Sequence, residues 1–134
     1  MNILLVDDDY LLAKGTAKLL ERLSGHKVQI TDDPYKIIHK CETREIDLVM
    51  MDVNIPGAIW EGKEVSGADL CFLLKNNPET ADIPIILVTA YAMLTERNSL
   101  LQQSQANDLC TKPITNYEEL IELINSLVEK TGTG

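Results

Sequence analysis

The sequence predicts a single α/β domain in which a five-stranded parallel sheet is covered by helices on both faces. Five short β-rich runs alternate with five segments of helical period along the 134 residues. Four of the β-rich runs are almost continuously apolar, which is typical of strands buried on both faces. The chain is 45% hydrophobic and 25% charged, as in an ordinary globular domain, and it is long enough to bury a core.

The predicted strands are residues 2–6, 27–31, 46–51, 83–88 and 108–111. The second of these runs alternates polar and apolar residues, as a half-exposed strand does. Strands that alternate with helices favour a parallel sheet with right-handed crossovers, which leaves few topologies. We therefore expect the commonest doubly wound arrangement at this size, the flavodoxin-like strand order 2-1-3-4-5.

The predicted helices are residues 10–23, 34–45, 67–77, 93–105 and 115–130. Asp33 and Pro34 form an N-cap and first-turn pair, and Asp9 is predicted as an N-cap or first-turn charge. Thr115 and Glu118 have the spacing of a capping box. The first helix is expected to bury one apolar face made of Leu12, Ala13, Thr16, Leu19, Leu20 and Leu23. The domain then spans residues 1–130, and residues 131–134 form a frayed tail.

Charge and cysteine usage narrow the classes of partner and compartment. The formal net charge is −9, without a Lys/Arg cluster, which argues against nucleic acid or a membrane as a direct partner. No apolar run approaches the ~20 residues that span a bilayer. Met1 leads straight into the first predicted strand and leaves no room for a signal peptide. The three cysteines, Cys41, Cys71 and Cys110, are odd in number and widely spaced, which favours reduced thiols over disulfides. We therefore expect a cytoplasmic protein.

Polar residues follow four of the five predicted strands, namely Asp7 and Asp8, Asp52, Thr89 and Lys112. The carboxyl ends of parallel strands meet at one rim of the sheet, and the first and third strands are neighbours in the expected order. Carboxylates ~4 Å apart repel by about 4 kcal/mol at an effective dielectric constant of ~20, so a cation is expected among the three aspartates. Mg²⁺ suits such oxygen ligands. A hydroxyl and an ammonium can hold phosphoryl oxygens, and an aspartate can act as the nucleophile.

Four stretches of the chain, taken together and in order, resemble the receiver domain of two-component response regulators. They are ILLVDDD, DLVMMDVNIPG, IILVTAYA and TKPI, and they extend along the whole chain. The resemblance implies that Asp52 accepts a phosphoryl group from a histidine kinase or a phosphotransfer protein. It also implies signalling by surface change to a partner, rather than an enzyme acting on an external substrate.

The resemblance further implies a role for each polar residue at the rim. The implied Mg²⁺ ligands are the carboxylates of Asp7, Asp8 and Asp52 and the backbone carbonyl of Asn54, with Asp7 acting largely through bound water. Thr89 would hydrogen-bond the phosphoryl group. Lys112 would pair with that group, next to a cis bond to Pro113.

Several positions depart from the usual receiver pattern. Residues 57–66, which include Trp60, form an insertion between Asp52 and Gly67, and we expect it either to cover apolar surface or to contribute to partner choice. Gln105 stands where a C-capping glycine is usual. Tyr91, two residues beyond Thr89, is expected to shield the acyl phosphate and slow its hydrolysis.

Leu109 stands where most receivers carry Tyr or Phe as a rotamer switch. A side chain without a ring gains little from switching, so we expect a weaker response on the face formed by segments 93–105, 108–111 and 115–130, and a larger share of signalling through residues 57–66. That face remains the expected partner or homodimer surface. It carries many apolar residues: Tyr117, Leu120, Ile121, Ile124 and Leu127.

Two alternatives remain open at the level of the sequence. A degenerate receiver could act only as a protein-binding scaffold. A phosphatase resembling the haloacid-dehalogenase class also uses Asp, Thr or Ser, Lys and Mg²⁺ at strand ends. DDDYL contains the D-x-D motif of that class, but KPITNYEEL lacks its acidic pair, and 134 residues leave no room for a cap domain.

Overall fold

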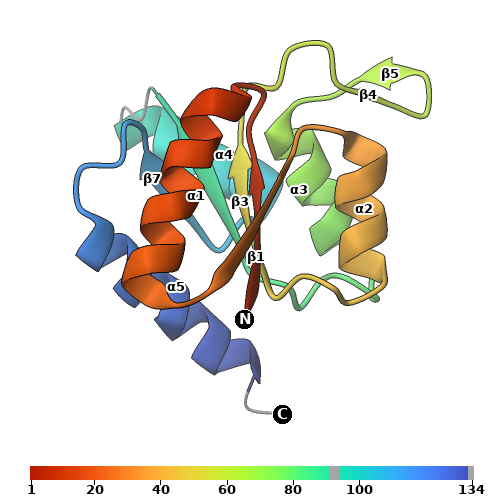
Figure 1. The fold of residues 1–134 in the computed structure, drawn as a ribbon. Coiled ribbons are helices and arrows are strands. Elements are labelled where there is room, and N and C mark those ends of the chain that lie inside the picture. Colours follow the sequence, from red (N-terminus) through yellow and green to blue (C-terminus); the bar gives the residue numbers. More distant parts are fainter. Residues whose placement is uncertain (91–93, 133–134) are drawn as a thin grey trace.

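A five-stranded parallel sheet forms the centre of the molecule, as the computed structural model shows for residues 1–90 and 94–132 (Figure 1). Its strands are β1 (Asn2–Val6), β2 (Lys27–Thr31), β3 (Leu48–Asp52), β6 (Ile85–Thr89) and β7 (Asp108–Thr111). They are hydrogen-bonded in the order β2-β1-β3-β6-β7. The predicted doubly wound order 2-1-3-4-5 is therefore confirmed. Among the described residues, no helix has the length and apolarity needed to cross a membrane.

Five helices cover the two faces of the sheet: α1 (Tyr10–Ser24), α2 (Pro34–Glu42), α3 (Gly67–Lys75), α4 (Leu94–Ser104) and α5 (Tyr117–Gly132). Helices α1 and α5 pack on one face, where their side chains form a core with β1, β3 and β6. Helices α2, α3 and α4 pack on the other face in a second core. Tyr91, for which a shielding role is predicted, lies outside the described residues.

The central strands are buried as their apolar sequences predict, whereas β7 is less buried. Every residue of β3 is buried, and β1 and β6 are buried over four of their five residues. In β7 only Leu109 is buried, at 3% exposure. Leu109 belongs to the core under α2, α3 and α4, and Cys110 packs against the core under α1 and α5, so both faces of β7 contact a helical layer as expected. The ends of β7 are less buried than those of the central strands because it is the last strand of the sheet.

Helix α1 buries only part of the face that was expected, because Ala13 and Leu20 are buried whereas the other leucines of that face are not. Its buried residues are Ala13, Ala17 and Leu20. Three leucines expected in the core are exposed by 41–55%, namely Leu12, Leu19 and Leu23. Small alanine side chains let the helix approach the sheet closely, so the leucines are displaced to the flanks. An apolar surface is therefore left on α1.

The predicted helix caps are confirmed for the first two helices and corrected for the last. The Asp9 and Asp33 carboxylates accept hydrogen bonds from backbone N–H groups in the first turns of α1 and α2. In α5 the Asn116 side chain accepts a hydrogen bond from the backbone N–H of Glu119. The predicted capping box at Thr115 is wrong because α5 begins at Tyr117, so the N-cap is Asn116, one residue later than predicted.

Within residues 57–66 the chain forms an ordered β-hairpin, which the sequence pattern did not predict. Its strands are β4 (Ile59–Trp60) and β5 (Lys63–Glu64), joined by Glu61 and Gly62 with φ of 49° and 80°. Positive φ at both turn residues is typical of a type I′ hairpin turn. The hairpin projects above α2 and α3 (Figure 1), and the Trp60 ring lies 4.7 Å from that of Tyr35 in α2.

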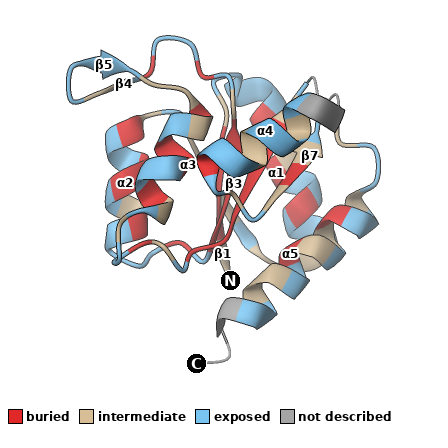
Figure 2. Cartoon of the chain, turned by 180° about the vertical axis from the view of Figure 1, so that it is seen from behind, coloured by how far each residue is buried: buried red, intermediate tan, exposed pale blue. Residues whose placement is uncertain are grey.

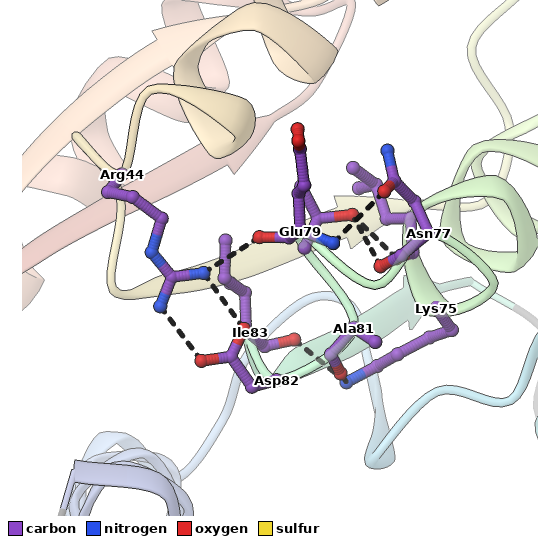
Figure 3. Close-up of polar contacts among 9 residues, drawn as sticks. Arg44, Lys75, Asn77, Glu79, Ala81, Asp82 and Ile83 are labelled. Atoms are coloured by element: carbon purple, nitrogen blue, oxygen red, sulfur yellow. Dashed lines mark hydrogen bonds and ion pairs between the residues drawn. The ribbon is translucent and has the colours of Figure 1, made fainter. Parts of the chain in front are cut away.

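A polar network ties together two loops at the end of the sheet opposite the carboxyl ends of the strands (Figure 3). Arg44 donates to both carboxylate oxygens of Asp82 at 2.8 Å and to the backbone carbonyl of Glu79. The hydrogen bond from Arg44 lowers the pKa of Asp82. Lys75 donates to the carbonyls of Ala81 and Ile83, and burial lowers its pKa. These bonds anchor the loop that leads into β6.

Candidate functional site

Three carboxylates meet at the carboxyl ends of two adjacent strands. Asp7 and Asp8 follow β1, and Asp52 ends β3, which pairs with β1 up to Val6 and Met51. One oxygen from each aspartate lies within 4.8 Å of the others. The Asp52 side chain is 5% exposed and that of Asp7 10%, whereas Asp8 is exposed. The structure thus brings together the three aspartates that the strand order predicted.

Lys112 supplies the positive charge of this cluster. Its Nζ lies 2.6 Å from Oδ2 of Asp52 and 3.5 Å from Oδ2 of Asp7. Burial lowers the pKa of Lys112, but the hydrogen bond and charge of Asp52, with the charge of Asp7, outweigh burial and raise the pKa overall. The lysine follows β7, and its bond to Pro113 is cis, as expected. It therefore remains charged and faces Asp52 from the edge of the sheet.

The two buried aspartates also accept hydrogen bonds from the backbone. The Asn54 N–H donates to Oδ1 of Asp52 at 3.1 Å, and the Asp9 N–H donates to Oδ1 of Asp7 at 2.9 Å. Burial raises the pKa of Asp7 in spite of this bond and of the Lys112 charge. Both oxygens of Asp52 therefore have a partner, one neutral and one charged.

The carboxylates repel one another, and the single lysine offsets only part of this repulsion. At 4.8 Å two like charges repel by roughly 3 to 4 kcal/mol at an effective dielectric constant of about 20. Three carboxylates and one ammonium leave a net charge of −2 in the cluster. A divalent cation with oxygen ligands neutralises this charge, so the donor set fits Mg²⁺.

Thr89 and Asn54 lie at the same rim. Thr89 is the last residue of β6, one position beyond Val88, which is the register partner of Asp52. Its side chain is half-buried, and its backbone carbonyl accepts the N–H of Lys112 at 3.0 Å. Asn54 is exposed, in the loop after β3. The roles predicted for the Thr89 hydroxyl and the Asn54 carbonyl stay predictions.

Gly67 supports the site in a way that the sequence pattern alone did not reveal. A Cβ at this position would lie 1.9 Å from the backbone oxygen of Asp52. The Gly67 N–H donates to the carbonyl of Val53 at 2.8 Å, which fixes the start of α3 against β3. The sequence feature that could have located this glycine is the capping box of Ser66 and Asp69, because it places Gly67 at the first position of the helix.

The sequence was compared with models of known protein families, and one of them matches most of the chain. The family model described as the response regulator receiver domain matches residues 3–125. The chain belongs to the response regulator receiver family. Other receivers resemble this one in both sequence and fold.

The sensor histidine kinase GacS of Pseudomonas protegens is 35% identical to the receiver over 116 residues, which are 87% of this chain and 12% of GacS. The transcriptional regulator RpaA of Synechocystis is 30% identical over 129 residues, 96% of this chain and 49% of RpaA. The receiver therefore spans between about one eighth and one half of the length of these relatives.

Among solved structures, the receiver domain of the histidine kinase PA1611 from Pseudomonas aeruginosa has the same fold. It superposes with a TM-score of 0.76 at 23% identity, covering 96% of this chain and 97% of the other. That receiver is described with a magnesium ion coordinated in its active-site cleft.

Proposed function

We propose that this receiver accepts a phosphoryl group on Asp52 from a histidine kinase or a phosphotransfer protein, in a cytoplasmic, Mg²⁺-dependent reaction. The observation that carries the proposal is the environment of Asp52. Its carboxylate is 5% exposed, lies 2.6 Å from the Lys112 ammonium, and belongs to a carboxylate cluster with Asp7 and Asp8. The matches to a sensor kinase and to a transcriptional regulator support a phosphorelay role.

In the proposed transfer, one oxygen of Asp52 forms a bond to phosphorus while the bond from phosphorus to the donor imidazole nitrogen breaks. The electron pair of the broken bond goes to that nitrogen, and the product is an acyl phosphate. A carboxylate nucleophile needs no general base. We assign the Lys112 ammonium and the Thr89 hydroxyl to contacts with the phosphoryl oxygens as their charge develops.

A bound Mg²⁺ supplies positive charge for the phosphoryl oxygens. We assign its ligands to the carboxylates of Asp7, Asp8 and Asp52 and the backbone carbonyl of Asn54. The net charge of −2 in the cluster supports this assignment, as does the magnesium described in the cleft of the PA1611 receiver. Asp7 is less exposed than Asp8, and it also accepts the backbone N–H of Asp9. We assign Asp7 to contacts with the metal through bound water.

The start of α1 favours a protein as the phosphoryl donor. Tyr10, Leu11 and Leu12 follow directly after the aspartates, and they are exposed by 59%, 83% and 55%. A donor histidine must reach Asp52 from this open rim, so its protein necessarily covers the neighbouring surface. Large apolar side chains exposed beside the acidic cluster favour a protein-binding surface at this rim.

We assign the output surface to α4, β7 and α5, where a downstream partner or a second copy binds. A groove of about 620 Å³ lies there, lined among others by Leu109, Leu120 and Leu123. Leu109 is 3% exposed, and it has no ring that could exchange between buried and exposed positions. The surface change is therefore expected to be weaker here than in receivers that carry an aromatic residue, with a larger share through the β4–β5 hairpin.

The test is incubation with Mg²⁺ and acetyl phosphate, followed by intact mass. We expect a stable gain of one phosphoryl group per chain, and no gain in Asp52→Asn. Asp9→Asn is a matched control in the same acidic rim, because Asn also caps the helix, and it is expected to behave as the unaltered chain.

Three results contradict the proposal. A phosphoryl group retained by Asp52→Asn at the same stoichiometry shows that the nucleophile is another residue. The absence of any adduct on the unaltered chain favours a degenerate receiver that acts as a scaffold. Continuous release of phosphate from unrelated phosphomonoesters favours a phosphatase of the haloacid-dehalogenase type.

A further inference from the structure

A second groove lies between the β4–β5 hairpin, α3 and the end of α4, and among the described residues it shares no lining residue with the acidic cluster or with the groove beside α5. Its volume is about 480 Å³. The apolar part of its lining comes from the hairpin and from α3, namely Trp60, Val65, Ala68, Phe72 and Leu73. Figure 2 views the side of the molecule on which α3 lies between the hairpin and α4. We call this feature the hairpin groove.

The hairpin groove is lined by large apolar side chains, of which Trp60 and Val65 also pack against the core and Phe72 and Leu73 are exposed. Phe72 and Trp60 are the single Phe and the single Trp of the chain. Phe72 is 44% exposed and Leu73 39%, whereas Leu70, Cys71 and Leu74 of the same helix are buried in the core. Aromatic side chains are enriched among residues that dominate binding at protein interfaces.

Several contacts hold the hairpin in place beside α2. The Tyr35 hydroxyl accepts a hydrogen bond from the backbone N–H of Glu61 at 3.1 Å, and the Tyr35 ring packs on Trp60. The Val65 N–H donates to the carbonyl of Ala58 at the base of the hairpin. A surface that is already ordered loses less conformational entropy when a partner binds.

The polar rim of the hairpin groove is acidic. Glu61, Glu64 and Asp69 contribute three carboxylates, against the single ammonium of Lys63. All four residues are exposed, and one oxygen of the Asp69 carboxylate also accepts the backbone N–H of Ser66 in the capping box of α3. Electrostatic complementarity therefore favours a cationic partner and disfavours a second copy of this chain, which carries a net charge of −9.

We propose that the hairpin groove binds a basic amphipathic helix of a partner protein. The apolar face of that helix packs on Trp60, Phe72 and Leu73, and its Lys or Arg side chains meet the three carboxylates of the rim. A helix laid in an apolar groove is a recurring mode of peptide recognition, with anchors at i, i+3 or i+4. The experiment below uses the unphosphorylated chain, so its failure and a failure of phosphorylation at Asp52 are separate results.

The probe is a synthetic helical peptide with Leu on one face and Lys on the other. Its binding to the full chain is followed by Trp60 fluorescence and by backbone amide chemical shifts. The shifts are expected to concentrate in residues 59–73 and at the end of α4. A peptide of the same pattern with Glu in place of Lys is expected not to bind, and a scrambled Leu/Lys peptide is expected to bind much more weakly.

Matched variants separate the hairpin groove from general attraction to an acidic protein. Phe72→Ser and, independently, Leu73→Lys are expected to weaken binding by about tenfold or more, as loss of an interface anchor does. Leu19→Ser on α1 removes a leucine of similar exposure, 41%, and is expected to leave binding within about twofold. Glu61→Gln with Glu64→Gln is expected to weaken binding several-fold at low salt and less at high salt.

Four outcomes overturn the proposal. The first is a set of amide shifts confined to α1 or to the groove beside α5. The second is unchanged affinity in both Phe72→Ser and Leu73→Lys, with thermal unfolding confirming that the variants are folded. Equal binding of the Glu peptide is the third. The fourth is a concentration-dependent dimer of the free chain that Phe72→Ser converts to a monomer, because a second copy is then the occupant.

Discussion

Replacing Gly67 by Ala tests how closely α3 is packed against the backbone of Asp52. The added Cβ would lie 1.9 Å from the carbonyl oxygen of Asp52, whereas Cβ atoms essentially never come within 3.0 Å of another heavy atom. The helix and the strand must therefore separate by about 1.1 Å at this point. The obstacle is backbone rather than a flexible side chain, so a rotamer change cannot relieve it.

We expect this change to lower the free energy of unfolding by about 2 to 4 kcal/mol. Overpacking costs about 1 to 3 kcal/mol. Separation also lengthens the hydrogen bond from the Gly67 N–H to Val53, now 2.8 Å, and a backbone hydrogen bond contributes about 0.5 to 1.5 kcal/mol. Because Asp52 moves with its backbone, phosphorylation by acetyl phosphate is expected to slow as well.

Urea unfolding followed by Trp60 fluorescence and circular dichroism measures this effect. Gly15→Ala is the matched control, because Gly15 lies within α1 and a Cβ there would meet nothing within 4 Å. Alanine is a better helix former than glycine, so the control is expected to raise stability by about 0.5 to 1 kcal/mol. A Gly67→Ala variant within about 0.5 kcal/mol of the unaltered chain would refute the argument from close packing.

Three further predictions concern a helix end, a surface ion pair and the metal site. Gln105 follows α4 with φ of 63°, so Gln105→Gly is expected to stabilise the fold by about 0.5 to 1 kcal/mol in urea unfolding; a loss of stability contradicts the strain argument. Arg44 lowers the pKa of Asp82, so the stability from this pair is present above the ordinary pKa of the carboxylate and is lost as the pH falls through the lowered value. Both side chains are more than half exposed, so Arg44→Ala is expected to lower the free energy of unfolding by only about 0.5 kcal/mol at pH 7. Thermal unfolding near pH 2 is expected to show a smaller difference between the variant and the unaltered chain. A difference of the same size at both pH values contradicts a contribution from the ion pair. Asp8→Asn is expected to weaken Mg²⁺ binding by about tenfold or more in calorimetry, because it removes one of the few carboxylate ligands. The control variant Asp9→Asn is expected to leave Mg²⁺ binding unchanged. Equal effects of the two variants would argue against a metal site that includes Asp8.

The positions of the acidic residues could be predicted because they depend on periodicity and topology alone. Asp7 and Asp52 come at the ends of apolar runs, and parallel strands place their carboxyl ends at one rim. Once the strand order is 2-1-3-4-5, β1 and β3 are neighbours and their terminal carboxylates are adjacent. Lys112 follows a strand in the same way, and its approach to Asp52 is a consequence of the same topology.

The face that α1 buries could not be decided from the sequence. Leucines occur on more than one side of this helix, so the helical period is compatible with several orientations. The sheet decides between them, because Ala13 and Ala17 allow a close approach that larger side chains would prevent. Phe72 and Leu73 are exposed for the same reason, because the side of α3 that faces the sheet carries Leu70, Cys71 and Leu74 instead.

The β4–β5 hairpin and the contact of Gly67 also required the tertiary structure. Two strands of two residues each are too short to produce a periodic pattern, and the hairpin is held by Tyr35, which lies far from it in the sequence. Gly67 is uniquely suited to its position because the backbone of Asp52 passes beside it. The sequence by itself determined the order of strands and the chemistry at their ends, since both follow from local pattern. Only the tertiary structure decided which surfaces are buried, because burial depends on what the rest of the chain places opposite each residue.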